Sequence, residues 1–221
     1  MRVYGLDARV CYLGIDTDLF RPTGAPKEKF VVGLGSFHVV KGIDLAIRAI
    51  ATIDAALRPS LVWIGNAAVP GYLEEMSQLA ESLGVNFLPK ELVGQDELVD
   101  LLSRAAVMVY TSRLEPFGYA PLEANACETP VVGIAEGGIR ESIEPGINGS
   151  LIETGDPIAL GQCIMRYVDN LDISRSEGIK ARNHILKTWQ VEAAVERLEM
   201  HLVEVLQAKP QVSESGDICQ T

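Results

Sequence analysis

The sequence has few cysteines and no long apolar run. Its four cysteines, at positions 11, 127, 163 and 219, are far apart, and none has the CxxC spacing of a zinc site or a dithiol redox motif. No apolar stretch reaches the roughly 20 residues that a membrane-spanning helix needs, and the first residues do not resemble a signal peptide. These features predict a protein without a membrane span, in a reducing, cytoplasmic compartment.

Positive charge is also scarce. The 19 Lys and Arg residues stand against 30 Asp and Glu residues, which gives a formal net charge of −11 at pH 7. Binding to nucleic acid or to an anionic membrane surface depends on many Lys and Arg contacts, so we expect neither kind of partner. A small anionic ligand is still compatible with this balance if a few local donors hold it.

Length and composition predict one globular domain with flanking segments. The chain has 221 residues, of which 48% are hydrophobic, enough to bury a core without disulfides. Residues 1–29 are mixed and punctuated by Gly and Pro, and they resemble the end of a preceding unit. Residues 30–208 form the predicted domain, and the polar, aperiodic residues 209–221 are expected to be a disordered tail.

Short apolar runs alternate with segments of helical periodicity along the domain. Strands that are apolar throughout are typical of a parallel sheet covered by helices on both faces. The sequence therefore predicts a doubly wound, Rossmann-like α/β fold, in which ligands bind at the carboxyl ends of the strands. The expected strands are 30–35, 61–65, 85–88, 107–110, 130–134 and 150–152, with a further short one at 10–13; the expected helices are 43–53, 72–83, 96–106, 119–126, 157–168, 173–188 and 191–207.

The loop after the first strand of the domain contains Gly33, Gly35 and Lys41-Gly42. A dinucleotide fingerprint would need a third glycine where His38 stands, and a P-loop would need the order Gly-Lys-Ser/Thr. The remaining parts are a glycine turn, one lysine and a helix N-terminus, which together can bind a phosphate. Taken alone, the loop is better explained as a structural turn with a solvated lysine.

The loop after Tyr110 is more informative. Glu115 lies in the loop, Gly118 directly precedes a predicted helix, and Glu123 lies in that helix. Backbone N–H groups near Gly118 and Tyr119 would form an anion cradle flanked by two acceptors for hydroxyl groups. The simpler alternative makes Glu115 a helix cap or a partner of Arg113, and Glu123 a surface acid.

Two other stretches carry less weight. The double glycine Gly137-Gly138 could allow a ligand to approach the backbone, or could simply form a turn before a short helix. Asp16-Thr17-Asp18 looks like an acidic triplet for a metal–nucleotide, but it lies outside the edge where ligands are expected. The three histidines have no ligand spacing, so no metal is predicted.

The run from Glu115 to Glu123, continued by residues 124–132, resembles the signature of glycosyltransferase family 4, also called glycosyl transferases group 1. Further matches are 13–22, which resembles the connector between the two domains of these enzymes, and 35–44, 137–138, 144–149 and 155–157. The resemblance covers about residues 10–206. It implies the GT-B fold, of which residues 30–208 would be the C-terminal, nucleotide-sugar-binding half, and a reaction that retains the configuration of the transferred sugar.

The resemblance also implies roles for individual residues toward a UDP- or GDP-sugar. Lys41 would contact the diphosphate, and Glu123 would accept hydrogen bonds from the ribose hydroxyls. Glu115 would hold a hydroxyl of the transferred sugar in the catalytic centre. The backbone would support the phosphates and the sugar at Phe117, Gly118 and Tyr119. No metal or other cofactor is implied, and base selection is expected from loops such as 88–91.

This sequence departs from the family at two positions of the site. Ser36 stands where the family usually has an arginine that pairs with the lysine on the diphosphate. Ser36 can donate a hydrogen bond but brings no charge, and Arg113 or Arg140 could compensate. Tyr119 replaces a common leucine, which should be tolerated because the backbone makes the contact.

The resemblance implies a partner for the chain, because the acceptor-binding half of a GT-B enzyme would precede residue 1. We therefore expect little transfer from this chain alone. Residues 1–22 and the last helix would dock on that half, or the chain would self-associate. Two alternatives are a nucleotide-sugar-binding protein without chemistry, favoured by Ser36, and a nucleotide-sugar epimerase, which the spacing of Glu115 and Glu123 disfavours.

Overall fold

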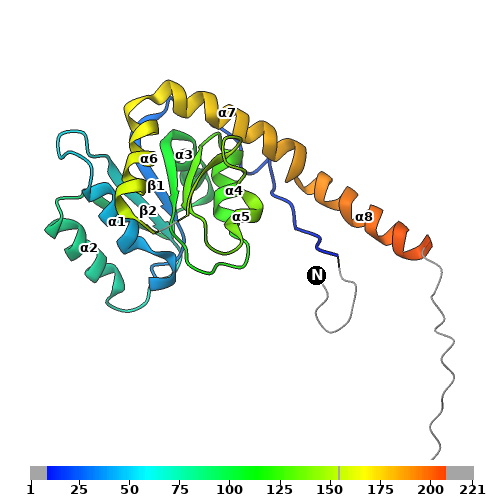
Figure 1. The fold of residues 1–221 in the computed structure, drawn as a ribbon, viewed down its shortest axis with the longest axis horizontal. Coiled ribbons are helices and arrows are strands. Elements are labelled where there is room, and N and C mark those ends of the chain that lie inside the picture. The colour runs from blue at the N-terminus through cyan, green and yellow to red at the C-terminus, as the bar shows by residue number, and fades with distance from the viewer. Residues whose placement is uncertain (1–8, 154, 208–221) are drawn as a thin grey trace, which may run out of the picture.

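The computed structural model describes residues 9–153 and 155–207 and has one parallel sheet of six strands in the order β3-β2-β1-β4-β5-β6 (Figure 1). The two halves of the sheet run outward from β1 and β4, so the predicted doubly wound fold is confirmed. The strands are β1 (Glu28–Leu34), β2 (Ser60–Gly65), β3 (Phe87–Glu91), β4 (Ala105–Tyr110), β5 (Val131–Ile134) and β6 (Gly149–Ile152).

Helices cover both faces of the sheet, as the apolar strands require. The side chains of α1, α2 and α6 join one buried cluster, and those of α3, α4 and α5 join the other. Successive residues such as Val31 and Val32 project into opposite clusters. The helices are α1 (Ile43–Ala51), α2 (Tyr72–Ser82), α3 (Gln95–Arg104), α4 (Tyr119–Ala126), α5 (Ile139–Ser142), α6 (Pro157–Asp169), α7 (Leu171–Thr188) and α8 (Val191–Gln207), with a 3-10 turn, η1 (Val39–Lys41).

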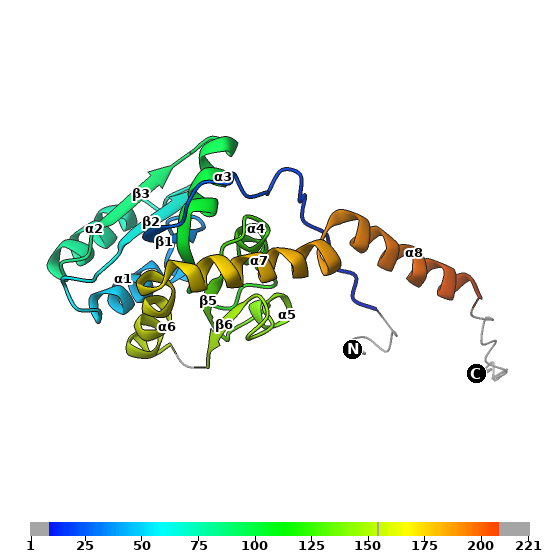
Figure 2. The same cartoon turned by 90° about the horizontal axis from the view of Figure 1, so that it is seen from above.

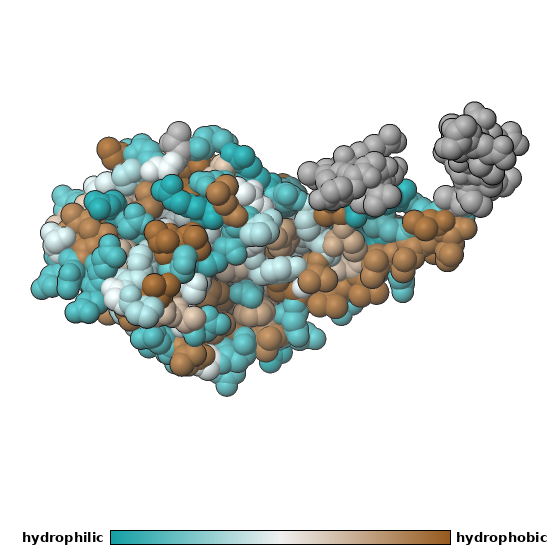
Figure 3. Space-filling view, turned by 90° about the horizontal axis from the view of Figure 1, so that it is seen from below, coloured by the Kyte–Doolittle hydropathy of each residue, from teal (hydrophilic) through white to brown (hydrophobic). Residues whose placement is uncertain are grey.

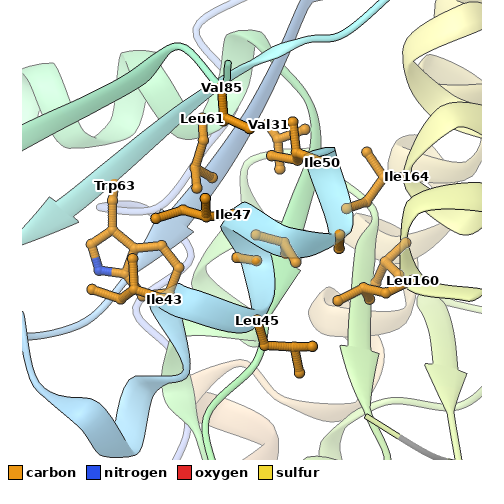
Figure 4. Close-up of a cluster of buried hydrophobic side chains, with 14 of the residues drawn as sticks. Val31, Ile43, Leu45, Ile47, Ile50, Leu61, Trp63, Val85, Leu160 and Ile164 are labelled. Carbon is orange, nitrogen blue, oxygen red and sulfur yellow. The ribbon is translucent and has the colours of Figure 1, made fainter. Parts of the chain in front are cut away.

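Helix α1 fixes the loop that precedes it to the centre of the sheet. Figure 4 shows Ile43, Ile47 and Ile50 of this helix between the strands and α6. All three side chains are fully buried. Because each buried isoleucine stabilises the fold by about 1.5–3 kcal/mol, the position of η1, immediately before α1, is firmly determined.

The last two helices leave the sheet. Helix α7 runs across the domain beside α4, and α8 projects away from the body (Figures 1 and 2). The connector meets them at the point where they join, since Ile15 N–H donates to the Trp189 carbonyl oxygen at 2.7 Å. Asp16, from the acidic triplet, uses its carboxylate to accept the N–H of Leu19 at 2.9 Å, which makes the triplet a turn.

Every strand and helix expected between residues 30 and 207 is present, with shifted ends at a few places. The strand expected at 85–88 begins two residues later, because Val85 N–H donates to the Ala80 carbonyl oxygen and closes α2. Helix α7 begins at Leu171, because the Asn170 side chain accepts N–H groups of its first turn. The strand expected at 10–13 is wrong: this segment pairs with no strand. The expected tail at 209–221 lies outside the described residues.

Candidate functional site

A cavity of about 490 Å³ opens at the carboxyl ends of β1, β2 and β4, where the fold predicts a ligand site. Five of the seven residues expected at the site line it: Lys41, Glu115, Gly118, Tyr119 and Glu123. An apolar wall of the same cavity comes from Leu92, Val93 and Leu98, at the β3–α3 turn and in α3. The cavity therefore combines a charged end with an apolar side.

The absence of a side chain at two glycine positions leaves room for Lys41 and its loop beside the cavity. Gly35 has φ of +151°, and a Cβ atom there would lie 3.1 Å from a methylene carbon of the Lys41 side chain. Gly42 has φ of +64°, and its Cβ atom would lie 2.3 Å from the Thr111 carbonyl oxygen. Any larger residue at either position would displace the lysine or the loop that follows β4.

Hydrogen bonds join η1 to the β4–α4 loop. The Thr111 hydroxyl donates to the Lys41 carbonyl oxygen at 2.9 Å, and Arg113 N–H donates to the Val40 carbonyl oxygen at 2.8 Å. These bonds hold together two loops that are about 70 residues apart in the sequence. They align Lys41 with Glu115 without depending on either side chain.

Lys41 and Glu115 form an ion pair, with 2.5 Å between Lys41 Nζ and Glu115 Oε2. The side chains are only 18% and 26% exposed, so Lys41 is not a solvated surface lysine. Glu115 pairs with this lysine and not with Arg113, against the simpler alternative considered above. The pair places one donor group and one acceptor group side by side at the cavity wall.

The N-terminus of α4 contributes backbone N–H groups to the same wall. Gly118, at φ of +84°, precedes the helix, and no side chain caps its first turn. Gly118, Tyr119 and Ala120 all line the cavity. Free N–H groups and the helix dipole favour an anion at such an end.

Glu123 lies one turn further along α4 and lines the cavity. Burial raises the pKa of its carboxyl from 4.5 to about 7. Burial is the one cause of this shift, with no contribution from a hydrogen bond or a charged neighbour among the described residues. A half-buried carboxyl that lacks donors is suited to accept hydrogen bonds from a ligand's hydroxyl groups.

Ser36 and Phe117 do not line the cavity. The Phe117 ring packs on the far side of its loop, stacked on Tyr12 at 5.0 Å and tilted against Trp189 at 5.4 Å. This aromatic contact anchors the loop that carries Phe117, and the backbone role that the resemblance implies for this residue stays a prediction. Ser36 lies beyond the cavity lining, at the start of the turn toward η1.

Neither arginine considered as a replacement for the missing charge reaches the main cavity. Arg140 lies on the surface, 3.8 Å from Glu153. Arg113 lines a neighbouring, more open cavity of about 420 Å³, which shares Lys41 and Glu115. Among the residues that line the main cavity, Lys41 is the only cation.

The double glycine supports the Glu115 loop from behind. A Cβ atom at Gly138 would lie 2.2 Å from the Pro116 carbonyl oxygen, and one at Gly137 would lie 2.6 Å from that of Glu115. Gly138 N–H donates to the Glu115 carbonyl oxygen at 2.8 Å. The backbone that approaches the two glycines closely is thus that of the loop carrying Glu115, and not a ligand in the main cavity. Neither glycine lines that cavity.

Tyr110 is a cavity residue that the sequence reasoning missed. It is the last residue of β4, and a Cβ atom on Gly118 would lie 2.5 Å from its hydroxyl. Burial and the charge of Glu115 raise the pKa of the phenol. Its position at the carboxyl end of a central strand was the available signal. Residues 88–91, which were expected to be a loop, belong to β3, and the turn beyond them lines the cavity with Leu92 and Val93.

Within the described part of the chain, no group of three His, Cys, Asp or Glu side chains could hold a metal ion. None of the helices in that part of the chain combines the length and the apolar character of a membrane-spanning segment.

Comparison with known proteins gives one consistent family. The family model described as "Glycosyl transferases group 1" matches residues 15–184. The N-acetyl-alpha-D-glucosaminyl L-malate synthase of Bacillus anthracis is 28% identical over 202 residues, covering 91% of this chain and 52% of the relative. The chain thus spans about half the length of this curated relative.

Solved structures show the same fold. Sucrose-phosphate synthase from Thermosynechococcus elongatus has a TM-score of 0.78 at 24% identity, over 91% of this chain and 53% of that chain. Anabaena Alr3699/HepE in complex with UDP-glucose has a TM-score of 0.75 at 23% identity, over 89% of this chain and 57% of that chain. In both cases the match covers about half of the longer protein.

Proposed function

Because the chain belongs to the glycosyl transferases group 1 family, we propose that it is the donor-binding half of a retaining glycosyltransferase. It binds a UDP-sugar, and the sugar passes to a hydroxyl acceptor held by a second half. The observation that carries this proposal is the grouping of Lys41, Glu115, Glu123 and the uncapped start of α4 around one cavity.

Each part of the cavity suits one part of such a donor. Lys41 and the N–H groups of α4 are donors for a diphosphate. Glu123 is an acceptor for the two ribose hydroxyls, and Glu115 for a hydroxyl of the sugar. The apolar wall at Leu92 and Val93 offers a surface for the base. We propose uridine and not guanosine as the base because a structural neighbour, Anabaena Alr3699/HepE, is in complex with UDP-glucose.

Charge on the leaving diphosphate would be neutralised without a metal. Lys41 and the helix dipole of α4 are oriented before the reaction, and such fixed groups stabilise developing negative charge effectively. Transfer also needs an aligned acceptor and a site closed to water. A second half of the enzyme would supply both, so this chain alone is expected to transfer little.

A second candidate function is binding of a nucleotide sugar without transfer. Two observations favour it: Lys41 is the one cation among the residues lining the main cavity, and Ser36 lies outside this lining. The two candidates differ in an assay with an acceptor-binding half supplied as a separate chain. Sugar transfer in that mixture supports the enzyme, and nucleotide binding without transfer supports the second candidate.

Thermal unfolding against UDP, GDP, ADP and their sugar conjugates tests the proposed donor. A ligand at 100 times its dissociation constant should stabilise the fold by about 2.7 kcal/mol, a rise in Tm of roughly 5–11 °C for a chain of this size. We expect the rise with UDP and UDP-sugars only. Lys41→Ala should abolish it, whereas Lys90→Ala, which removes a lysine paired with Glu97 outside the cavity, should not. No rise with any nucleotide would contradict the proposal.

Tyr110 should contribute to binding through its hydroxyl alone. Tyr110→Phe keeps the buried ring and removes the group beside Gly118 and Glu115. We expect affinity for a UDP-sugar to fall about tenfold, the effect of one lost hydrogen bond in a buried site. Tyr167→Phe is the matched control, because its hydroxyl bonds to Glu177 away from the cavity. Equal affinity of Tyr110→Phe and the unaltered chain, measured by calorimetry, would show that the phenol serves packing only.

A further inference from the structure

A separate cavity of about 350 Å³ lies at the amino ends of the strands, and we call it the Lys27 cavity. Its wall includes Lys27 directly before β1, Ser103 in the last turn of α3, Glu128 after α4 and Leu171 at the start of α7. The donor cavity lies at the opposite, carboxyl edge of the same sheet. A second half that closed over the donor would meet that carboxyl edge, so the Lys27 cavity is separate from both.

The connector forms one wall of the Lys27 cavity with residues 22 and 24–27. Figure 2 shows the connector running along the body from the junction of α7 and α8 to the start of β1. The hydrophobic residues of α8 gather at the other end of the molecule (Figure 3). The cavity is therefore not part of that apolar surface.

Lys27 is a half-buried lysine without an ion-pair partner among the described residues. Burial lowers the pKa of its ammonium group from 10.5 to about 7, although Cys127 and Glu128 favour the charged form. Asp172 and Arg175, which bear opposite charges, also line the cavity. The side chain thus lies where the neutral amine is stable, because burial disfavours the charged form more than its neighbours favour it.

One hydrogen bond orients the amine. Lys27 Nζ donates to Thr129 Oγ1 at 2.6 Å. The Thr129 hydroxyl donates its single hydrogen to the Leu102 carbonyl oxygen, so it can only accept from the lysine. A neutral Lys27 amine therefore keeps its lone pair available for attack on an electrophile.

The thiol on the same wall does not compete with the amine. Cys127 is fully buried, and burial raises the pKa of its thiol to about 12. Only the thiolate is an effective nucleophile, and this thiol stays protonated at neutral pH. Lys27 is thus the nucleophile that the cavity presents.

We propose that Lys27 is a modification site, whose amine takes a short acyl group from an acyl phosphate. Nζ attacks the acyl carbon, the bond from that carbon to the phosphate oxygen breaks, and its electron pair leaves with the phosphate. The nitrogen passes one proton to solvent, so the products are an amide and inorganic phosphate, without any change of oxidation state.

The cavity suits both parts of this reagent. A water molecule occupies about 30 Å³, so a cavity of about 350 Å³ has room for an acyl group of a few atoms. The exposed guanidinium of Arg175 on the cavity wall is a donor for the phosphate. The resulting amide would carry no charge, which suits the desolvated position of the Lys27 nitrogen.

Reaction with acetyl phosphate at pH 7.5, followed by peptide mass spectrometry, tests the site. Lys29 is the matched control, because it is exposed and lies two residues further along the chain. An ordinary solvated lysine is only about 0.1% neutral at this pH, so we expect acetylation of Lys27 to be at least about tenfold faster than that of Lys29. In the chain unfolded in urea, both lysines should react at the same rate, since the fold creates the difference.

The pH dependence distinguishes a reactive amine from a merely accessible one. The rate at Lys27 should level off above about pH 8, where its amine is already neutral. The rate at Lys29 should continue to rise by about tenfold per pH unit, as for any solvated lysine. A folded chain in which Lys27 stays unmodified or reacts no faster than Lys29 overturns the proposal, as does a Lys27 rate that rises as steeply with pH as that of Lys29.

Discussion

Glu123→Gln is expected to raise the free energy of unfolding of the unliganded chain by about 3 kcal/mol at pH 8. Burial moves the pKa of this carboxyl from its ordinary value of 4.5 to about 7 in the folded chain. Each pKa unit corresponds to about 1.4 kcal/mol. The whole shift therefore corresponds to about 3 kcal/mol, by which a charged Glu123 opposes folding at pH 8. A neutral glutamine of similar shape removes the opposition.

The sign of the pH dependence follows from the same pKa values. The folded state holds the proton more tightly than the unfolded state, so stability from this group is complete below about pH 4.5 and is lost as the pH rises through 7. Urea denaturation of the unaltered chain and of Glu123→Gln should therefore give curves that coincide in acid and diverge toward pH 8. Glu91→Gln, at an exposed position, is the control: its denaturation curves should match those of the unaltered chain both in acid and at pH 8.

The same substitution should weaken nucleotide binding. Ribose hydroxyls bonded to a carboxylate make charge-assisted hydrogen bonds, which are stronger than those to an amide. We expect Glu123→Gln to raise the dissociation constant of UDP by about 10–100-fold, since hydrogen bonds to charged groups contribute roughly 1.5–3 kcal/mol. A variant that is more stable yet binds UDP as well as the unaltered chain would remove Glu123 from the ribose site.

Glu115→Gln and Lys41→Met should change binding in opposite directions. Lys41 is held by Glu115 at 2.5 Å in the unliganded chain, so a diphosphate must compete with this carboxylate. Removing the charge of Glu115 releases the lysine, and we expect UDP to bind several-fold more tightly. Lys41→Met removes the cation and leaves a carboxylate facing the phosphates, and binding of UDP should weaken by about 100-fold.

The sugar distinguishes the two roles further. If Glu115 holds a sugar hydroxyl, Glu115→Gln should lose the additional affinity of UDP-glucose over UDP, although UDP itself binds more tightly. Titration calorimetry with both ligands measures the two effects in one experiment. Weaker binding of UDP to Glu115→Gln would contradict the competition argued from the ion pair, and unchanged binding to Lys41→Met would exclude Lys41 from the diphosphate site.

The sequence alone predicted the sheet because the strands are continuous apolar runs bounded by Gly and Pro. It predicted five of the cavity residues because they follow or lie near the carboxyl ends of strands. It did not predict that Lys41 would pair with Glu115. That contact joins residues 74 positions apart and depends on the backbone at Gly42, which only the packed structure determines.

Other features depend on packing between loops. The support of the Glu115 loop by Gly138 requires two turns to touch, and no local pattern encodes that approach. Tyr110 could have been found by asking which side chain ends each central strand. The error at residues 10–13 has a different origin: an apolar run of strand length becomes a strand only where another strand is available to pair with it.

The most direct test of the account is a titration of the chain with UDP-glucose at pH 8. We predict saturable binding at one site per chain, strongly weakened in both Lys41→Met and Glu123→Gln and unchanged in Lys90→Ala. This result would place the donor in the cavity between η1 and α4. Binding that is equally strong in all four proteins would contradict that placement, and no binding to the unaltered chain would contradict the donor-binding function itself.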